Sequence, residues 1–481
     1  MIYHSTRNES LRADSAQAVL EGLAPDGGLY VPAQLPAFDW KACLQGSAMD
    51  MATSILSALL PDIPDMPELV RRAYTGKFTT EELTPTVAVG NQYVLELFHG
   101  PTSAFKDVAL CMLPQLLTAA RRAKGMQENI LILTATSGDT GKAALEGFKD
   151  VDGIKICVFY PYGGVSQVQR AQMVTQEGEN VTVCAVVGNF DDAQTGVKNI
   201  FAACRDKALK HRLSSANSIN IGRLAPQVMY YFKAYRDLMD MGRIQLGDEV
   251  NFSVPTGNFG DILAGYLAKL LGLPVGKLIC ASNANNVLTD FIRTGTYDRL
   301  RPLYKTTSPS MDILVSSNLE RLLYLLSGDA NLVSGLMKQL SESGSYTVPD
   351  ALLEKIQSEF WADFCDDAGA EAVMGRVFRD YGYVCDPHTA SGWLAAESYV
   401  NQTGDNRPMV VLSTASPYKF PEAVLTAIGQ TPAGDGFDQM EQLNRATKVA
   451  IPANLATLRE KTERHTGVIE KDAMLSFVLD I

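Results

Sequence analysis

The chain has 481 residues, 46% of them apolar and 20% charged, and its 42 basic and 54 acidic side chains give a net charge of −12. This length exceeds one hydrophobic core, so we expect two or three globular domains, and the acidic balance argues against nucleic acid or an anionic membrane as a partner. The eight scattered cysteines predict buried free thiols, and the five histidines have no spacing that favours a metal site.

The N-terminal segment, Met1 to Arg7, has no charged and then apolar leader, and no stretch approaches the roughly 18 apolar residues of a membrane-spanning helix. We therefore expect a cytoplasmic protein without a membrane partner. From Ser10 to about Tyr74 the pattern is helical, with one Gly- and Pro-rich break at residues 22–32. This pattern predicts a mostly helical N-terminal domain over residues 1–88.

A polar turn with Gly100 and Pro101 precedes Lys106, which opens an apolar helical run. A lysine in this position is a candidate covalent anchor for a carbonyl cofactor such as pyridoxal phosphate, because a desolvated amine is a good nucleophile. Most lysines are solvated surface charges, however. The rest of the chain has to decide between these two interpretations.

Beyond Val87, short β-branched runs alternate with amphipathic segments, which predicts strands followed by helices. The predicted strands are 130–134, 154–160, 181–187, 250–255 and 409–412, and the predicted helices are 142–148, 167–175, 193–204 and 262–271. Repeated βα units imply parallel sheets covered on both faces. We predict an α/β region over residues 89–481, with a mostly helical insertion near 303–380.

Ligands of such sheets bind beyond the carboxyl ends of the strands, so the loops there are the places to search. The loop after the first predicted strand contains Thr136, Ser137, Asp139 and Thr140 at a helix start, where N–H groups and hydroxyls suit a carboxylate. An ionised Asp139 cannot itself bind a carboxylate, and a helix cap by Ser137 or Asp139 is the structural alternative. The spacing does not fit a P-loop.

A second loop follows the strand at 250–255 and contains Gly257, Asn258, Phe259, Gly260 and Asp261. A glycine loop before a helix can aim several backbone N–H groups at one phosphate, although a simple turn also needs glycine. The pattern is not G-x-G-x-x-G, which disfavours a dinucleotide.

A third loop, at 413–420, places Thr414 where a buried strand ends. A neutral hydroxyl facing a pyridine nitrogen would tune the cofactor's capacity to accept electrons, whereas an ordinary strand-end turn is the alternative.

Taken in order, the segments 98–107, 137–141, 257–261 and 413–420 resemble the threonine synthases, pyridoxal-phosphate enzymes of the tryptophan-synthase β-like group. Segments 3–8, 22–32 and 386–390 resemble other parts of that family. The resemblance implies an α/β fold, the fold type II of pyridoxal-phosphate enzymes, with two parallel-sheet αβα lobes over residues 89–481 and an N-terminal helical domain.

The resemblance also implies roles for individual residues. Lys106 would be the Schiff-base lysine and the catalytic base, with Phe105 beside it. Residues Gly257 to Asp261 would hold the cofactor phosphate, and Thr414 would face the pyridine nitrogen.

The implied reaction of this lyase family converts O-phospho-L-homoserine and water to L-threonine and phosphate by β,γ-elimination and β-addition of water, the last step of threonine biosynthesis. The loop Thr136 to Thr140 is the candidate for the substrate carboxylate. The substrate phosphate needs cationic or amide donors, for which Asn220 and Arg223 are candidates, with Lys142 and Arg170 as alternatives.

Two other functions fit the same motifs. One is a phospho-lyase that releases 2-oxobutanoate and ammonia, and the other is a catalytically silent binding protein, against which the presence of Lys106 argues. The sequence leaves open whether the protein is a monomer or a homodimer.

Overall fold

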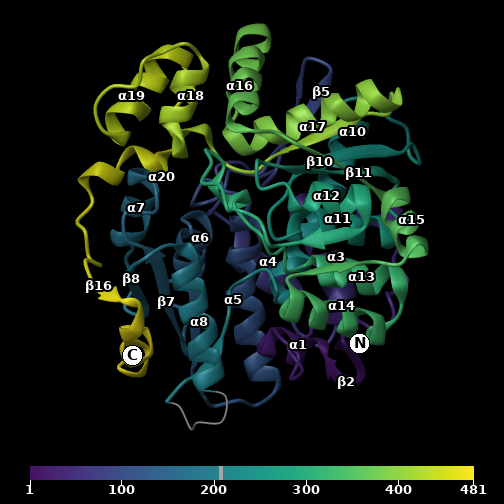
Figure 1. Ribbon diagram of the computed structural model, residues 1–481, viewed down its shortest axis with the longest axis vertical. Coiled ribbons are helices and arrows are strands. Elements are labelled where there is room, and N and C mark those ends of the chain that lie inside the picture. The colour runs from purple at the N-terminus through teal and green to yellow at the C-terminus, as the bar shows by residue number, and fades with distance from the viewer. Residues whose placement is uncertain (205–209) are drawn as a thin grey trace.

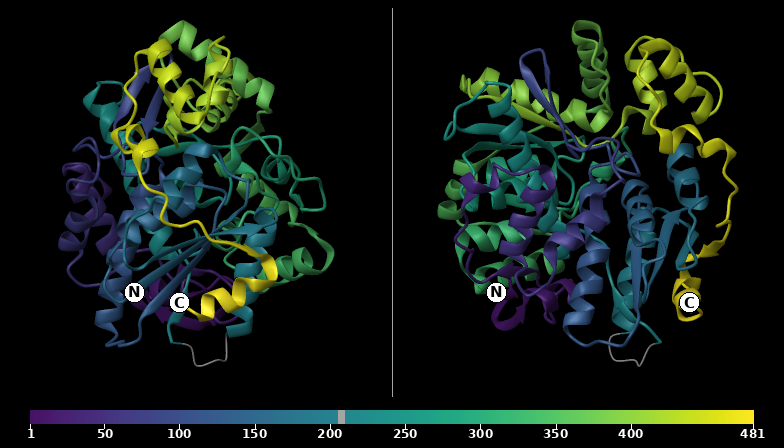
Figure 2. Two further views of the ribbon diagram at one scale, coloured as in Figure 1. Left: turned by 90° about the vertical axis from the view of Figure 1, so that its left-hand side faces the viewer. Right: turned by 180° about the vertical axis from the view of Figure 1, so that it is seen from behind.

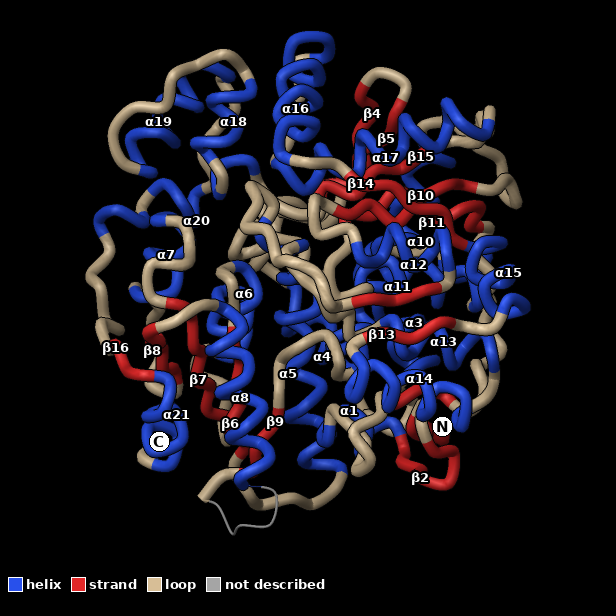
Figure 3. Tube along the Cα trace, viewed as in Figure 1, coloured by secondary structure: helices blue, strands red, loops and turns tan. Residues whose placement is uncertain are grey.

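A computed structural model describes residues 1–204 and 210–481, and it contains two large, mainly parallel β-sheets (Figure 1). Figure 3 shows their strands as two separate groups on either side of the molecule. None of the helices in the described residues is both long and apolar enough to cross a membrane. All eight cysteines are buried and free, as predicted.

The first sheet has six strands, all parallel to their neighbours except the last pair. In spatial order they are β14 (Phe360–Phe364), β11 (Val275–Ser282), β10 (Val250–Pro255), β15 (Met409–Ser413), β5 (Gln92–Glu96) and β4 (Thr86–Val89). The helices that pack around it are α10 (Val228–Asp240), α11 (Gly260–Leu270), α12 (Val287–Thr294) and α17 (Pro387–Thr403). Figure 1 shows α17 on one side of the sheet and α11 and α12 on the other.

The second sheet has five parallel strands. In spatial order they are β16 (Val468–Glu470), β8 (Val181–Val187), β7 (Ile154–Pro161), β6 (Ile130–Ala135) and β9 (Arg212–Ser214). The accompanying helices are α5 (Lys106–Ala123), α6 (Asp139–Phe148), α7 (Gln167–Val174), α8 (Phe190–Cys204) and the short α9 (Ile221–Leu224). The predicted strands and helices of both sheets are therefore present, with ends shifted by a few residues.

The N-terminal region differs from the helical expectation. Its elements are β1 (Ile2–Ser5), β2 (Asn8–Asp14), α1 (Ser15–Glu21), β3 (Tyr30–Pro32), α2 (Trp40–Cys43), α3 (Ala48–Leu59) and α4 (Met66–Tyr74). The helical prediction from Ser10 onward is wrong for Ser10–Asp14, because this segment pairs with β1 in a three-stranded antiparallel sheet. The boundary expected at residue 88 falls inside β4, a strand of the six-stranded sheet.

The segment near 303–380, expected to be mostly helical, carries α13 (Leu319–Ser327), α14 (Ala330–Ser343), α15 (Asp350–Glu359) and α16 (Asp367–Tyr381). It also contains β13 (Ser345–Thr347), which pairs with β12 (Thr296–Asp298), and β14, the edge strand of the six-stranded sheet. The segment is thus built into that sheet and is not purely an insertion.

The C-terminal part of the chain adds α18 (Pro421–Ala427), α19 (Gly436–Thr447), α20 (Ala453–Ala456) and α21 (Met474–Leu479). Figure 2 shows this last part, in yellow, running down the outside of the five-stranded sheet to the end of the chain. Its strand β16 extends that sheet next to β8. The chain therefore crosses between the two sheets once more after β15.

Candidate active site

Lys106 is held at the end of β15 by two short segments that pair with each other. The N–H of Phe105 donates to the carbonyl of Thr414 at 2.8 Å, and the N–H of Ser416 donates to the carbonyl of Ser103 at 3.1 Å. Ser103 adopts a left-handed φ of 60°, which turns the chain into α5. The first residue of α5 is therefore fixed at the mouth of the six-stranded sheet, as the polar turn before it suggested.

The amine of Lys106 is almost completely buried, with 7% of the residue exposed. Its Nζ donates to the Ser310 hydroxyl at 3.0 Å and lies 3.9 Å from a carboxylate oxygen of Asp139. Burial lowers the pKa of Lys106 to about 8, the charge of Asp139 opposes this shift, and the charges of Arg223 and Lys419 add to it. A lysine with this pKa has a sizeable neutral fraction near pH 7.5, as a nucleophile or base requires.

Asp139, at the start of α6, belongs to a buried charge cluster. Lys419 is fully buried, lies 2.6 Å from one oxygen of Asp139, and also donates to the carbonyl of Thr102. Gln169 donates to the same carboxylate at 2.9 Å. Burial alone raises the pKa of Asp139, but the charges of Lys419 and Lys106 outweigh it, so the net pKa lies well below its usual range.

The loop after β10 has the features of an anion site. Phe259 has a φ of 61°, a left-handed conformation that non-glycine residues rarely adopt. Among the hydrogen bonds of residues 1–204 and 210–481, none uses the backbone N–H of Gly257, Asn258 or Phe259. A Cβ on Gly257 would lie 2.5 Å from the carbonyl oxygen of Ser310, so only glycine fits there. The loop thus presents free donors at the start of α11.

Arg223 contributes a positive charge to the same pocket. The residue is 4% exposed, and its guanidinium donates to the carbonyl of Ala216 at 2.5 Å. Its Nε is buried without a partner among the described residues. An unpaired buried donor is costly unless a ligand satisfies it, which makes an anion the expected occupant.

These features fit pyridoxal phosphate: a desolvated lysine for its carbonyl carbon and free N–H groups for its phosphate. One pocket is lined by the predicted residues Phe105, Lys106, Thr140, Arg223, Gly257, Asn258, Phe259, Gly260, Asp261 and Thr414. Asp139 does not line this pocket but approaches Lys106 from α6.

Three other predicted residues do not line this pocket. The Thr136 hydroxyl accepts from the N–H groups of Gly138 and Gly141 at 3.0 and 2.8 Å. Asn220 caps α9 by accepting from Gly222 N–H at 2.8 Å. Ser137 lines a neighbouring cavity. The alternative cations are paired with acidic side chains, Lys142 with Glu146 and Arg170 with Glu463.

Sequence reasoning missed several residues of the pocket. Ser310 and His388 line it directly, while Lys419 and Gln169 reach Asp139 from other segments. Ser310 lies in a loop with no adjacent predicted strand, so no local pattern marked it. Lys419 and His388 stand in segments that the sequence did single out, but their contacts depend on packing.

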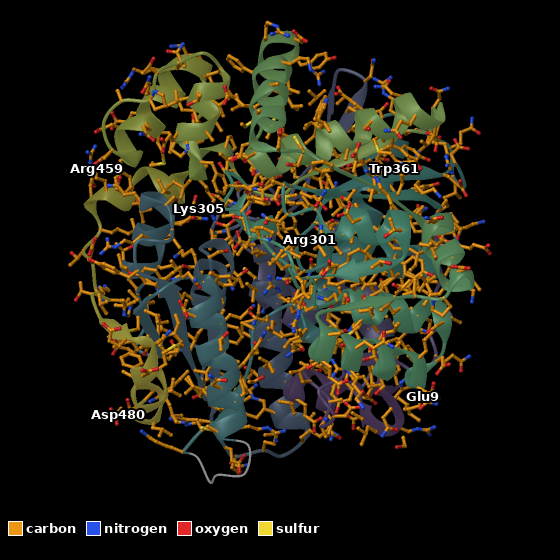
Figure 4. All side chains as sticks on the ribbon, in the orientation of Figure 1. Glu9, Arg301, Lys305, Trp361, Arg459 and Asp480 are labelled. Carbon is orange, nitrogen blue, oxygen red and sulfur yellow. The ribbon has the colours of Figure 1, made fainter. Side chains whose placement is uncertain are left out.

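A larger cavity of about 640 Å³ adjoins this pocket, because Pro309 lines the cavity and the next residue, Ser310, lines the pocket. Ser137 and Gln169 line it from the side of the five-stranded sheet, and Lys305 from the opposite segment. Figure 4 labels Lys305 above and to the left of the centre of the view. The cavity is therefore lined by segments that belong to both halves of the molecule.

Three family models match the chain. The model described as "Pyridoxal-phosphate dependent enzyme" matches residues 81–415, the one described as "Threonine synthase N terminus" matches residues 2–74, and "Threonine synthase, C-terminal" matches residues 389–478. Together the three matches reach from the first residues to near the last.

Individual proteins give the same result. The human protein named threonine synthase-like 1 is 41% identical over 434 residues, which cover 86% of this chain. The chain spans only 58% of that relative's length. Threonine synthase of Pseudomonas aeruginosa is 40% identical over 480 residues, 97% of this chain and 95% of that one.

The crystal structure of the pyridoxal-phosphate-bound threonine synthase from Brucella melitensis superposes with a TM-score of 0.87 at 40% identity. That superposition covers 100% of this chain and 98% of the Brucella chain. The predicted fold type II of pyridoxal-phosphate enzymes is thereby confirmed. The protein belongs to the threonine synthase family of pyridoxal-phosphate-dependent enzymes.

Proposed function

We propose that the protein is a threonine synthase, a carbon–oxygen lyase that converts O-phospho-L-homoserine and water to L-threonine and phosphate. The observation that carries this proposal is the pocket in which the buried Lys106 amine faces the free N–H groups of residues 257–259 and the unpaired Nε of Arg223. The similarity to threonine synthases over nearly the whole chain supports the same reaction.

In the proposed binding mode, three separate segments of the chain hold the cofactor. Lys106 would bind the carbonyl carbon, residues Gly257 to Gly260 the phosphate, and the Thr414 hydroxyl the pyridine nitrogen. When bound, pyridoxal phosphate supplies an electron sink that makes proton removal beside the amino group feasible. A hydroxyl opposite the ring nitrogen donates or accepts one hydrogen bond and carries no charge.

Lys106 is the proposed acid and base. Formation of threonine from O-phospho-L-homoserine requires protons to leave Cα and Cβ, a proton to reach Cγ, where phosphate departs, and a proton to return to Cα. The low pKa of Lys106, caused mainly by burial, lets one amine accept and release these protons near neutral pH. Arg223 is the candidate for a phosphate group, because its Nε is buried and unpaired.

The direct test measures both products of one reaction. The purified protein with pyridoxal phosphate is given O-phospho-L-homoserine, and phosphate, threonine and 2-oxobutanoate are assayed together. Threonine equal to phosphate is the expected result. Phosphate with 2-oxobutanoate and ammonia would instead identify the phospho-lyase, and a protein that binds cofactor without turnover would refute both.

Replacing Lys106 tests the anchor separately. The Lys106→Ala variant should lose turnover and the visible absorption band of the lysine-bound cofactor, whereas Lys142→Ala, which removes a cation paired with Glu146, should keep the band. A visible band that survives in Lys106→Ala would refute the assignment of this lysine.

A further inference from the structure

Ser310 contacts the reacting amine from a segment that has no other assigned role. Its hydroxyl accepts from Lys106 Nζ at 3.0 Å, across 204 residues of sequence. The residue lies in the 3-10 turn η2 (Pro309–Met311) and lines the same pocket as Lys106. The structure thus places a neutral hydroxyl in direct contact with the proposed acid and base.

The turn that carries Ser310 is held from α17. The backbone N–H of Ser310 donates to Nε2 of His388 at 3.2 Å, and Nδ1 of His388 lies 2.6 Å from a carboxylate oxygen of Asp386. Because Nε2 accepts from an amide, the proton of a neutral ring is on Nδ1 and is donated to Asp386. Asp386 is itself fixed as the N-cap of α17, where it accepts from the N–H of Thr389.

The geometry around Nζ explains why such a hydroxyl matters. A neutral lysine amine has two N–H bonds and one lone pair. Ser310 accepts one N–H, and the Asp139 carboxylate lies 3.9 Å away toward α6. The bond to Ser310 restricts rotation about Cε–Nζ, so this hydroxyl affects the direction in which the amine lone pair points.

We infer that Ser310 is a further catalytic residue, whose hydroxyl holds the free Lys106 amine in the orientation that moves protons to and from the substrate, and that His388 and Asp386 are its positioning residues. No proton is gained or lost by Ser310 in this role: the proton passes from the substrate carbon to the Lys106 lone pair and back. The inference rests on the proposed function of Lys106 as the base.

Charged groups also face Lys106, but they act differently. Asp139, Asp107, Arg223 and Lys419 all change the balance between its charged and neutral forms. Ser310 is uncharged, so removing its hydroxyl should leave the balance between the charged and neutral forms of Lys106 largely unchanged. It should disturb the orientation of the Lys106 amine instead. This difference separates the role of Ser310 from that of its charged neighbours.

The test compares Ser310→Ala with Ser391→Ala, a control that deletes a buried hydroxyl that donates to the carbonyl of Pro387 in its own helix. With O-phospho-L-homoserine, we expect the kcat for phosphate release to fall about 10- to 100-fold in Ser310→Ala, with KM changed by less than about threefold. Ser391→Ala should stay close to the unmodified protein. A kcat for Ser310→Ala within about twofold of this control would overturn the inference.

A second measurement does not depend on turnover. The free Lys106 amine must also attack the carbonyl carbon of pyridoxal phosphate when cofactor is added to the apoprotein. The visible band should therefore form several-fold more slowly in Ser310→Ala than in Ser391→Ala. Equal rates of band formation would contradict the orienting role, even if phosphate release were impaired.

These readouts separate the inference from the proposed function. If the unmodified protein releases phosphate but makes 2-oxobutanoate, the synthase proposal fails, while the rates of phosphate release in Ser310→Ala and Ser391→Ala still test the role of Ser310. If no phosphate is released, the rates of band formation in the same two variants test that role.

His388 is tested by a double-mutant cycle. If His388 acts through Ser310, His388→Ala should lower kcat in the unmodified protein and have little further effect in Ser310→Ala. Additive effects of the two changes would refute the positioning role of His388.

Discussion

The loop after β6 and the loop after β10 have the same local sequence pattern, but the pKa values of their aspartates shift in opposite directions. Each joins a buried strand to a helix through a glycine, and each places an aspartate in the first helical turn: Asp139 in α6 and Asp261 in α11. Asp139 faces two lysines, so its pKa falls well below its usual range in spite of burial. Burial raises the pKa of Asp261 to about 7, and the hydrogen bonds from Tyr230 and Tyr231 and the charge of Lys106 only partly offset this rise.

The two loops also use their backbone donors differently. In the first loop, Thr136 accepts from the N–H groups of Gly138 and Gly141, so these donors are satisfied within the loop. In the second, the N–H groups of residues 257–259 form none of the hydrogen bonds found in the described chain. The same local pattern can therefore form a charged cluster that shifts the pKa of a lysine, or a loop whose free N–H groups can bind an anion. The surrounding residues decide which of the two forms.

The largest effect should come from removing Lys419. Lys419→Met leaves the buried Asp139 without its nearest cation, and breaking such a pair costs about 3–5 kcal/mol of unfolding free energy. Thermal unfolding measures the loss. The double variant Asp139→Asn, Lys419→Met removes both charges and should recover much of it, and a double variant no more stable than Lys419→Met would show that the charges do not explain the loss.

The second effect concerns the open loop. Gly257→Ala places a Cβ 2.5 Å from the carbonyl oxygen of Ser310, so the turn or the loop must shift. Such a shift costs about 1–3 kcal/mol of strain, so affinity for pyridoxal phosphate should fall roughly 10- to 100-fold. Titration of the apoprotein with cofactor measures this affinity. Gly335→Ala, whose added Cβ would meet nothing within 4 Å, is the matched control. Unchanged cofactor affinity would argue against the proposal that residues 257–259 bind the cofactor phosphate.

The third effect should be confined to the first loop. Thr136→Val removes the acceptor of two N–H groups and should lower stability by about 1–2 kcal/mol, whereas Thr136→Ser keeps the hydroxyl and should cost less. Cofactor affinity, measured by the same titration, should change little in either variant. A large loss of affinity would mean that this loop, too, contacts the cofactor.

The fourth effect is a pH dependence of stability. Because the pKa of Asp261 is about 7 in the folded state and about 4 in an unfolded chain, the folded state binds more protons between these values, and this group's contribution to stability falls as the pH rises through that window. Asp261→Asn cannot titrate and still accepts from Tyr230 and Tyr231. Its melting temperature should therefore drop less between pH 5 and pH 8 than that of the unmodified protein.

The matched control for this last prediction is Asp152→Asn, which changes an aspartate whose side chain is 91% exposed. It should show the same drop between pH 5 and pH 8 as the unmodified protein. An Asp261→Asn variant that behaves like this control would contradict the assigned pKa.

Much of the fold followed from local patterns. The runs at 130–134, 154–160, 181–187 and 250–255 consist mostly of β-branched or apolar residues, as expected of strands buried on both faces. The sequence prediction was wrong for segments that become strands only by pairing with a partner strand. Asn8–Asp14 is polar and forms β2 only by pairing with β1, and Phe360–Phe364 lies between two helices and joins the sheet as its edge.

The candidate site divides in the same way. Lys106, the loop 257–261 and Thr414 lie directly beyond strands or at helix starts, so their places in one pocket could be inferred from chain order and the rule for parallel sheets. Ser310 and Lys419 approach Lys106 and Asp139 from distant segments. No local pattern records which side chains a folded turn will bring within 3 Å of another.

The sequence by itself therefore determined the parallel sheets, the glycine loops and the place of Lys106 at the start of a helix, because periodicity, backbone freedom and helix starts are local properties. Only the tertiary structure decided the charge state of Asp139, the neutrality of the groups around Asp261 and the partner of the Lys106 amine. Burial and the position of opposing charges set these quantities, and both arise only when separate segments of the chain are packed together.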